Sequence, residues 1–320
     1  MLMRAIAISI ATVLLCAPVA WCAYPDKPVR MVVPFAPGGG SDIVARLLAQ
    51  KTGALWNQSV VVDNRGGSGG VAGTNTVAKS APDGYTLLLT SISIAYSPAL
   101  YSSLPYDTER ELAPCILLVV QPSILAVHPA LAAKSIAELI ALAKARPGDI
   151  RYSSGGAGSA PHLAAEIFRS TAGIQLTHVP YKGGGAIVTA VLSGEVQMLF
   201  AGVASLMPHV KAGRLRALAV TGTARSKAAP ALPSIGEAGL PGAEFDGWYG
   251  LLLPAATPRD VVARINADYN KVLAAADVQE RLLASGFEPL GGSPQKFADY
   301  LRAETRKWTK VVRDANIHIE

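Results

Sequence analysis

The sequence has almost no cysteine. Two of its three cysteines, Cys16 and Cys22, lie within the first 23 residues, which leaves Cys115 as the only one in the rest of the chain. A single cysteine excludes an intramolecular disulfide and a metal site built from several cysteines. Because Ile116 and Leu117 follow Cys115, we expect a small buried side chain there, without a catalytic role.

Aromatic residues and clustered charges are also scarce. Phe, Trp and Tyr make up 6% of the chain, and the formal net charge of +6 includes no run of five like charges. The scattered charge argues against nucleic-acid binding, which needs a continuous basic surface. The histidines are isolated, and no group of His, Cys, Asp and Glu has the spacing of metal ligands. We therefore expect no nucleic acid, no metal and no cofactor.

The apolar run at the N-terminus is too short to span a membrane. Arg4 precedes an apolar stretch that Pro18 interrupts before the roughly 20 residues that a spanning helix needs. The small residues Ala20 and Ala23 then form a cleavage region. This pattern predicts an export signal over residues 1–23, with a membrane anchor or a lipid-attached form as weaker alternatives.

Glycine and proline, in contrast, are abundant. The 320 residues include 30 glycines and 22 prolines, and half of the chain is hydrophobic. This composition is typical of many short strands and helices joined by tight turns, which favours an α/β fold. The length fits one large domain or two domains of about 150 residues each.

Short apolar runs alternate with amphipathic helical segments in two blocks. Helices are expected between the strands: Ser41 or Asp42 caps the first, and Ser135 and Glu138 form a capping box. This order predicts two α/β units with parallel sheets and right-handed crossovers. The strands are expected at residues 29–34, 60–63 and 85–90, and then at 124–127, 151–154, 177–179, 198–201 and 215–221.

The end of the chain has helices without a sheet of their own. After a strand at 249–253, two helices are expected, which begin near Pro258 and Pro294. The first unit would cover their apolar faces, so the chain crosses between the units twice. The predicted domains are residues 24–124 plus 246–320, and residues 125–245.

Four glycine-rich segments stand where a strand leads into a helix. Glycine lets backbone N–H groups approach a ligand, and a helix N-terminus adds unpaired donors with a partial positive charge. Such loops meet outside the carboxyl ends of parallel strands, and together they suit a carboxylate. Each glycine taken alone is also a common turn residue. The segments are residues 35–42, 64–70, 154–162 and 181–185.

The second of these segments also matches an enzyme motif. Gly66 to Gly70 fits the G-x-S-x-G pattern of a serine hydrolase, with Ser68 as the nucleophile. Conceivable bases are His162, His178 and His209. A dinucleotide site at the same place lacks the acidic residue that it needs about 20 positions later. A secreted serine esterase that uses Ser68 is therefore one alternative function.

Two further features have both a functional and a structural interpretation. His162 lies in the first turn of a helix after a glycine-rich segment, where its side chain can face a cleft. Trp248 and Tyr249, near the second crossing, can form an aromatic wall of a site or pack in the core of a hinge.

Six segments together resemble a known family. The chain is similar, over nearly all of its length after residue 23, to the Bug, or TctC-like, substrate-binding receptors of tripartite tricarboxylate transporters. The segments are VRMVVPFAPGGGSD (29–42), VVVDNRGGSGGVAGT (60–74), APDGYTLLL (81–89), RYSSGGAGSAPHLAAEIF (151–168), HVPYKGGG (178–185) and PHVKAGRLRALAVTG (208–222).

The resemblance implies a Venus-flytrap fold, the type II periplasmic-binding-protein class, with two α/β domains on a hinge that the chain crosses twice. It implies a periplasmic monomer that binds a small carboxylate, without catalysis, and delivers it to the membrane permease subunits of a tripartite tricarboxylate transporter. A receptor for a signalling partner is the other alternative. Carried over by position, the ligand-binding residues are Phe35, Gly38, Gly39, Gly40, Ser41, Asp42, Gly67, Ser68, Ser91, Ser154, Gly158, Ser159, His162, Lys182, Gly183, Ala201 and Asp246.

The segment from Ala201 to Val203 departs from common forms of the family, which carry an acidic or amide residue there. Its apolar residues favour an apolar or aromatic body on the ligand. We expect loops 35–42 and 66–70 to bind one carboxylate. Closure of the hinge would bring loops 154–162 and 181–185 onto the other end of the ligand.

Overall fold

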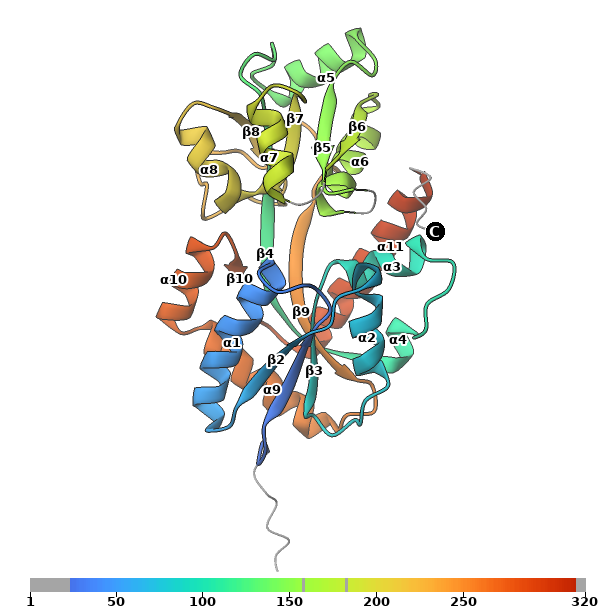
Figure 1. Ribbon diagram of the computed structural model, residues 1–320, viewed down its shortest axis with the longest axis vertical. Helices are drawn as coiled ribbons and strands as arrows, with labels where there is room; N and C mark the ends of the chain where they lie inside the picture. The colour runs from blue at the N-terminus through green and yellow to red at the C-terminus, as the bar shows by residue number, and fades with distance from the viewer. Residues whose placement is uncertain (1–23, 157–158, 182–183, 315–320) are drawn as a thin grey trace, which may run out of the picture.

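The chain folds into two lobes that two long strands connect (Figure 1). The computed structural model describes residues 24–156, 159–181 and 184–314. The predicted export signal, residues 1–23, lies outside the described residues. Within the described ranges, no helix combines the length and the hydrophobicity that crossing a membrane requires.

The lower lobe in Figure 1 is built on three parallel strands. The sequence predicted these three strands, and the structure places β1 (Val29–Val33) between β2 (Val60–Asn64) and β3 (Thr86–Ser91). Parallel neighbours need a crossover, and α1 (Gly40–Trp56) and α2 (Val71–Ala78) supply it. The carboxyl ends of these strands therefore point to one edge, where the first two glycine-rich segments begin.

The upper lobe repeats this arrangement. β5 (Arg151–Ser154) lies between the parallel strands β7 (Met198–Gly202) and β6 (Thr177–Pro180). The predicted capping box is present, because the N–H of Glu138 donates to Ser135 Oγ at 3.2 Å. The remaining elements are α5 (Ile136–Ala145), α6 (Ala160–Ala172), α7 (Gly184–Leu192), α8 (Val203–Lys211) and β8 (Arg216–Val220).

The two connecting strands correct the expectation of purely parallel sheets. β4 (Leu112–Val127) and β9 (Asp246–Pro254) are antiparallel to each other, and their pairing reaches Pro122 and Asp246. From Ser123 onwards β4 pairs instead with β7, so one strand of 16 residues serves both lobes. The sequence predicted only its last four residues, because Gln121, Pro122 and Ser123 interrupt the apolar run that precedes them.

The C-terminal region has three helices where the sequence predicted two. α9 (Arg259–Leu273) and α11 (Pro294–Asp314) match the prediction, and α10 (Ala276–Ala284) was missed. The break before α10 is an extended Ala275, which gives no glycine or proline signal. The other short elements are α3 (Ser93–Leu100), α4 (Thr108–Glu111) and β10 (Glu288–Pro289).

The core contains the remaining cysteine. Cys115 is fully buried, and its Sγ lies 3.8 Å from the carbonyl oxygen of Val262 on α9. Burial raises the pKa of the thiol to about 12, so the thiolate does not form at neutral pH. The prediction of a small buried residue is confirmed.

Candidate functional site

The glycine-rich segments after β1 and β2 pack against each other at the edge of the lower lobe. We call residues 35–42 and 66–70 the first-lobe loops. Asn64 Nδ2 donates to the carbonyl oxygen of Phe35 at 3.2 Å, and the N–H of Arg65 donates to that of Val33 at 2.8 Å. A Cβ on Gly66 would lie 3.4 Å from the backbone N of Ala36. The two loops are therefore one rigid unit.

Asp42 fixes the shape of the first of these loops. Its Oδ2 accepts hydrogen bonds from the N–H of Gly38 at 3.0 Å and from Arg46 Nε at 2.9 Å, and its side chain is buried. The hydrogen bond from Arg46 holds the pKa of Asp42 below its ordinary value. The carboxylate is therefore ionised at neutral pH, and its charge is paired within the loop.

The start of α1 faces the upper lobe and has no side-chain cap (Figure 1). The cap residue is an extended Gly39, which corrects the prediction that Ser41 or Asp42 caps this helix. The first N–H groups of an uncapped helix lack intrahelical partners. They carry a partial positive charge and suit an anion.

Aromatic side chains pack closely against the glycines of the first-lobe loops. A Cβ on Gly40 would lie 2.6 Å from Tyr249 Oη, and one on Gly70 would lie 3.3 Å from the ring of Phe35. Ser68 is exposed and has a left-handed backbone, with φ of 46°. Such a conformation is uncommon for a residue with a side chain, so the loop is held in a particular shape.

The second-lobe loop, defined as residues 154–156 and 159–162, is held by serine hydroxyls. Ser154 ends β5 and is fully buried, and its Oγ lies 3.0 Å from the N of Gly156 and 2.5 Å from His178 Nε2. Ser159 Oγ donates to the carbonyl oxygen of Gly156 at 2.7 Å. Ser159 is also the N-cap of α6 without capping it through its side chain. The loop therefore ends at a helix N-terminus, as the first one does.

Two imidazoles, the buried His162 and the half-buried His178, lie behind this loop. His162 is only 7% exposed, so only a small part of its side chain can face a cleft. Its ring centroid lies 4.4 Å from that of His178, which in turn stacks on Tyr152 at 5.0 Å. Burial, and then the neighbouring His178, lower the pKa of His162 to about 4, and burial lowers that of His178. Both rings are therefore neutral at neutral pH.

Ala201 and Asp246 lie on the strands near the junction of the lobes. Ala201 is 9% exposed, and the next residue, Gly202, approaches Gln121 of β4, whose Nε2 would lie 3.1 Å from a Cβ there. A neighbouring strand thus brings a polar side chain close to positions 201–203, which have none of their own. Asp246 begins β9, and burial raises the pKa of its carboxyl group to about 6.

The two candidate aromatic residues have different roles. Trp248 is 1% exposed and packs against Phe297 and Tyr300, as the hinge-core interpretation predicts. Tyr249 is half-buried and touches the start of α1 through its hydroxyl group. Neighbouring residues of a strand point to opposite faces, which separates the two rings.

The structure describes some of the other predicted site residues but not all of them. Ser91 ends β3, and its Oγ donates to Ser93 Oγ at 3.1 Å. Gly67 has φ of 136°, a conformation that favours glycine. Gly158, Lys182 and Gly183 lie outside the described residues. In the ranges that the structure does describe, no group of three His, Cys, Asp or Glu side chains is arranged to hold a metal ion.

Sequence reasoning underestimated His178 and missed Gln121. His178 was considered only as a base for Ser68, but it contacts Ser154 and His162 on two other elements. Position 178 is 24 residues from Ser154, and no sequence pattern joins them. Gln121 lies in the strand that was predicted too short, so nothing placed it near Gly202.

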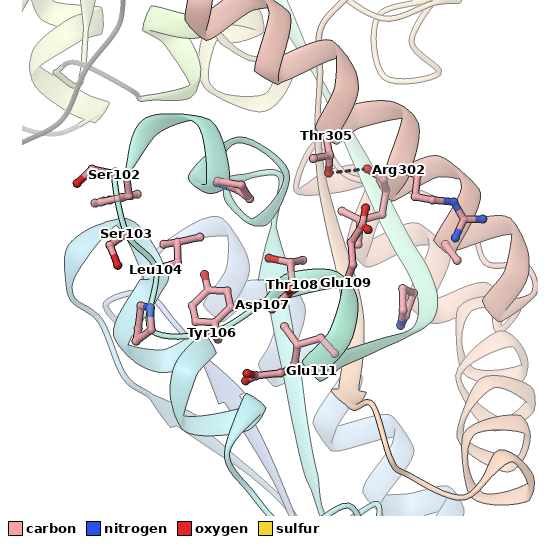
Figure 2. Close-up of a pocket in the computed structure, with 17 residues that line it drawn as sticks. Ser102, Ser103, Leu104, Tyr106, Asp107, Thr108, Glu109, Glu111, Arg302 and Thr305 are labelled. Atoms are coloured by element: carbon pink, nitrogen blue, oxygen red, sulfur yellow. Dashed lines mark hydrogen bonds between the residues drawn. The ribbon is translucent and has the colours of Figure 1, made fainter.

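A pocket of about 850 Å³ lies between the segment before β4 and α11 (Figure 2). The charged residues at its rim already have partners that stabilise the fold. Asp107 accepts hydrogen bonds from backbone N–H groups at the start of α4, and Glu111 forms an ion pair with Lys79 at 2.6 Å. Its wall touches the first-lobe loops through Tyr101, whose Oη would lie 2.8 Å from a Cβ on Gly69. Tyr101 therefore lies between the pocket and the first-lobe loops.

Comparison with known proteins gives the family. Residues 44–317 match the family model described as the tripartite tricarboxylate transporter family receptor. The chain belongs to this receptor family. The receptor is similar to the solved structure of the periplasmic binding protein BugD. The two sequences are 31% identical, the TM-score is 0.76, and the match covers 92% of this chain and 100% of BugD.

Two further solved structures contain carboxylates. A Rhodopseudomonas palustris protein solved with adipate is 34% identical to the receptor, with a TM-score of 0.79 over 92% of this chain and 100% of that one. MatC from the same species, solved with bound malate, is 28% identical, with a TM-score of 0.75 over 90% and 100%. These likenesses confirm the predicted fold class, two α/β lobes of the periplasmic-binding-protein type.

Proposed function

We propose that this receptor captures a small dicarboxylate between its lobes in the periplasm and releases it to a membrane transporter. The observation that carries the proposal is the uncapped N-terminus of α1, which faces the upper lobe. Asp42, the acidic residue of its first turn, is already paired with Arg46, so it does not repel an incoming anion strongly. Adipate and malate, the ligands of two relatives, are the first candidates.

Backbone N–H groups do most of the binding in this proposal. One carboxylate accepts from the first turn of α1, next to Gly67, Ser68 and Ser91. The other reaches the N-terminus of α6 at Ser159. Gly158, Lys182 and Gly183 lie outside the described residues and stay ligand contacts predicted from the sequence. The buried residues Asp42, Ser154 and His162 act by holding these loops in place.

We place the domain boundaries at the junction of β4 and β9, with residues 24–124 plus 246–320 in one domain and 125–245 in the other. The change of β4 partners at Ser123 supports this division. Contacts also cross the boundary: Ser226 Oγ donates to Glu288 at 2.6 Å, and Lys307 Nζ donates to the carbonyl oxygen of Glu244 at 2.6 Å. Hinge closure driven by the ligand would add to such contacts.

The receptor is proposed to act as an exported monomer whose closed form docks on the permease subunits of a tripartite tricarboxylate transporter. The family model supports this partner. A receptor for a signalling partner would use the same site, and pull-down of the receptor with co-expressed permease subunits separates the two roles.

The experiment is a thermal-shift screen of the mature protein with adipate, malate and other carboxylates, followed by calorimetry. A ligand of the folded state raises the melting temperature by mass action. Gly39→Val places a side chain at the start of α1, where the nearest atom to a Cβ is 3.8 Å away, so the fold tolerates it. We expect at least a tenfold loss of affinity, about 1.4 kcal/mol. The exposed Ala256→Val is the matched control.

Binding without turnover separates the receptor from the serine esterase alternative. The receptor should leave 4-nitrophenyl acetate uncleaved while it binds a dicarboxylate. Hydrolysis that Ser68→Ala abolishes would overturn the proposal, as would unchanged affinity in Gly39→Val.

A further inference from the structure

His178 connects the second-lobe loop to a buried polar cluster. Its Nε2 lies 2.5 Å from Ser154 Oγ, and the same oxygen accepts from the N–H of Gly156 at 3.0 Å. The carbonyl group of Gly156 accepts from Ser159 Oγ, the N-cap residue of α6. One chain of hydrogen bonds therefore runs from the imidazole to the helix N-terminus that the proposed function assigns to a carboxylate.

The groups around His178 come from the neighbouring strand and from α6. Tyr152 of β5 stacks on its ring, and His162 of α6 lies against it. Behind them, Glu166 accepts from Tyr152 Oη at 3.0 Å and pairs with Arg169 at 2.7 Å. The charge of Glu166 is thus already compensated, and α7 contributes no ionisable side chain, because its sequence is GGAIVTAVL.

We propose that His178 is a positioning residue for the second-lobe loop and that it couples carboxylate binding to the uptake of a proton by the His162–His178 pair. The inference rests on the proposed function, since it concerns the same carboxylate. Serine has one hydroxyl proton, and Ser154 keeps its bond to the N–H of Gly156 whether it donates to the imidazole or accepts from it. The loop therefore keeps its shape in both protonation states of His178.

The sign of the coupling follows from the burial of the pair. Burial lowers the pKa of both imidazoles in the free protein, so they are neutral above pH 6.5. Only Ser154 would separate a carboxylate bound at the loop from His178. The negative charge of this carboxylate stabilises the imidazolium form of His178. Stacked cations repel each other, so the pair accepts a single proton. Affinity for the anion should therefore rise as the pH falls below 6.5 while the protein stays folded.

Two substitutions separate positioning from proton uptake. Glutamine places an amide near the position of Nε2, so His178→Gln can bond Ser154 but cannot titrate. His178→Ala loses both properties. We expect His178→Ala to bind adipate or malate about tenfold more weakly than the wild type, which is the loss of one hydrogen bond that orders the loop. His178→Gln should stay within about threefold of the wild type at neutral pH.

Calorimetry at about pH 6, in buffers with different ionisation enthalpies, measures the proton uptake. The wild type and His209→Gln, which changes a histidine on α8, should take up a fraction of a proton for each adipate or malate bound. His178→Gln should take up none. Equal uptake by His178→Gln and the wild type, or unchanged affinity in His178→Ala, would overturn the proposal.

Hydrogen exchange of the free protein distinguishes this inference from the proposed function. The peptide that covers residues 151–163 should exchange faster in His178→Ala than in the wild type or in His178→Gln. If no dicarboxylate binds the wild type but this difference appears, the proposed ligand is wrong and the positioning role stands. If the three proteins exchange alike, the positioning role is wrong whatever the ligand.

Discussion

The first-lobe loops and the second-lobe loop have similar compositions, but different interactions hold them. The first-lobe loops depend on an ionised carboxylate, Asp42, which bonds Gly38 and Arg46, and on aromatic rings that press on glycines. The second-lobe loop depends on neutral groups, the hydroxyl of Ser154 and the imidazole of His178. Glycine-rich loops of the same appearance can therefore differ in their response to protons.

The difference follows from the ordinary pKa values of the groups. The lowered pKa of Asp42 keeps its carboxylate charged throughout the neutral and mildly acidic range. The imidazoles of His162 and His178 have ordinary pKa values much closer to neutral pH, and desolvation lowers the pKa of both. Acid should therefore change the charge of the imidazoles at the second-lobe loop before it changes that of Asp42.

The largest predicted effect tests the close packing of the first lobe. In Gly73→Ala, the new Cβ would lie 2.6 Å from the carbonyl oxygen of Arg65 and 2.7 Å from Cα of Pro34. Both atoms belong to the backbone and cannot rotate away, so we expect the free energy of unfolding to fall by about 1–3 kcal/mol. Urea denaturation followed by circular dichroism measures this change.

The matched control is a glycine of the upper lobe. Gly185 lies in α7, and a Cβ there meets no atom within 4 Å. Gly185→Ala should be neutral or stabilise the protein by about 0.5–1 kcal/mol, because alanine favours a helix. Equal urea midpoints for the two variants would show that α2 is not closely packed against Pro34 and Arg65.

The next prediction removes the charge that fixes the first-lobe loops. Asp42→Asn weakens the bond with Arg46 and the one with the N–H of Gly38, so the free energy of unfolding should fall by about 2 kcal/mol at neutral pH. The same urea experiment measures it. Asp149→Asn, at an exposed position of the upper lobe, should change stability by less than about 0.5 kcal/mol. Similar values for the two variants would mean that Asp42 does not hold its loop.

The smallest effect, expressed per pH unit, tests the acid sensitivity of the upper lobe. Between pH 6.5 and about 4, His162 binds a proton in the unfolded chain but not in the folded protein. Stability should therefore fall with decreasing pH, by roughly 1 kcal/mol per unit for this residue. His162→Phe keeps an aromatic ring beside His178 and should reduce that slope. Urea titrations at several pH values measure it, and an unchanged slope would argue against a neutral, buried His162.

Much of the fold was predictable because its signals are local. Apolar runs such as Val29–Val33 and the capping box at Ser135 locate their elements without reference to the rest of the chain. The missed features lack such signals. β4 continues through both lobes because β9, more than 100 residues later, satisfies its backbone, and α10 begins after an alanine.

The candidate site shows the same division. The sequence located its glycine-rich loops correctly between strands and helices, and the ligand contacts expected within them stay predictions. It did not show which side chains hold the loops. Tyr249 meets Gly40 from a strand that returns to the first lobe, and Gln121 meets Gly202 across two paired strands.

The sequence by itself determined the family, the two α/β units and the glycine-rich loops, since all of these depend on residues close together in the chain. The tertiary structure alone decided that Asp42 is paired inside its loop, and that Ser154, His162 and His178 from three different elements form one buried cluster. Burial sets the charge state of that cluster, and burial depends on packing between elements that no local pattern encodes.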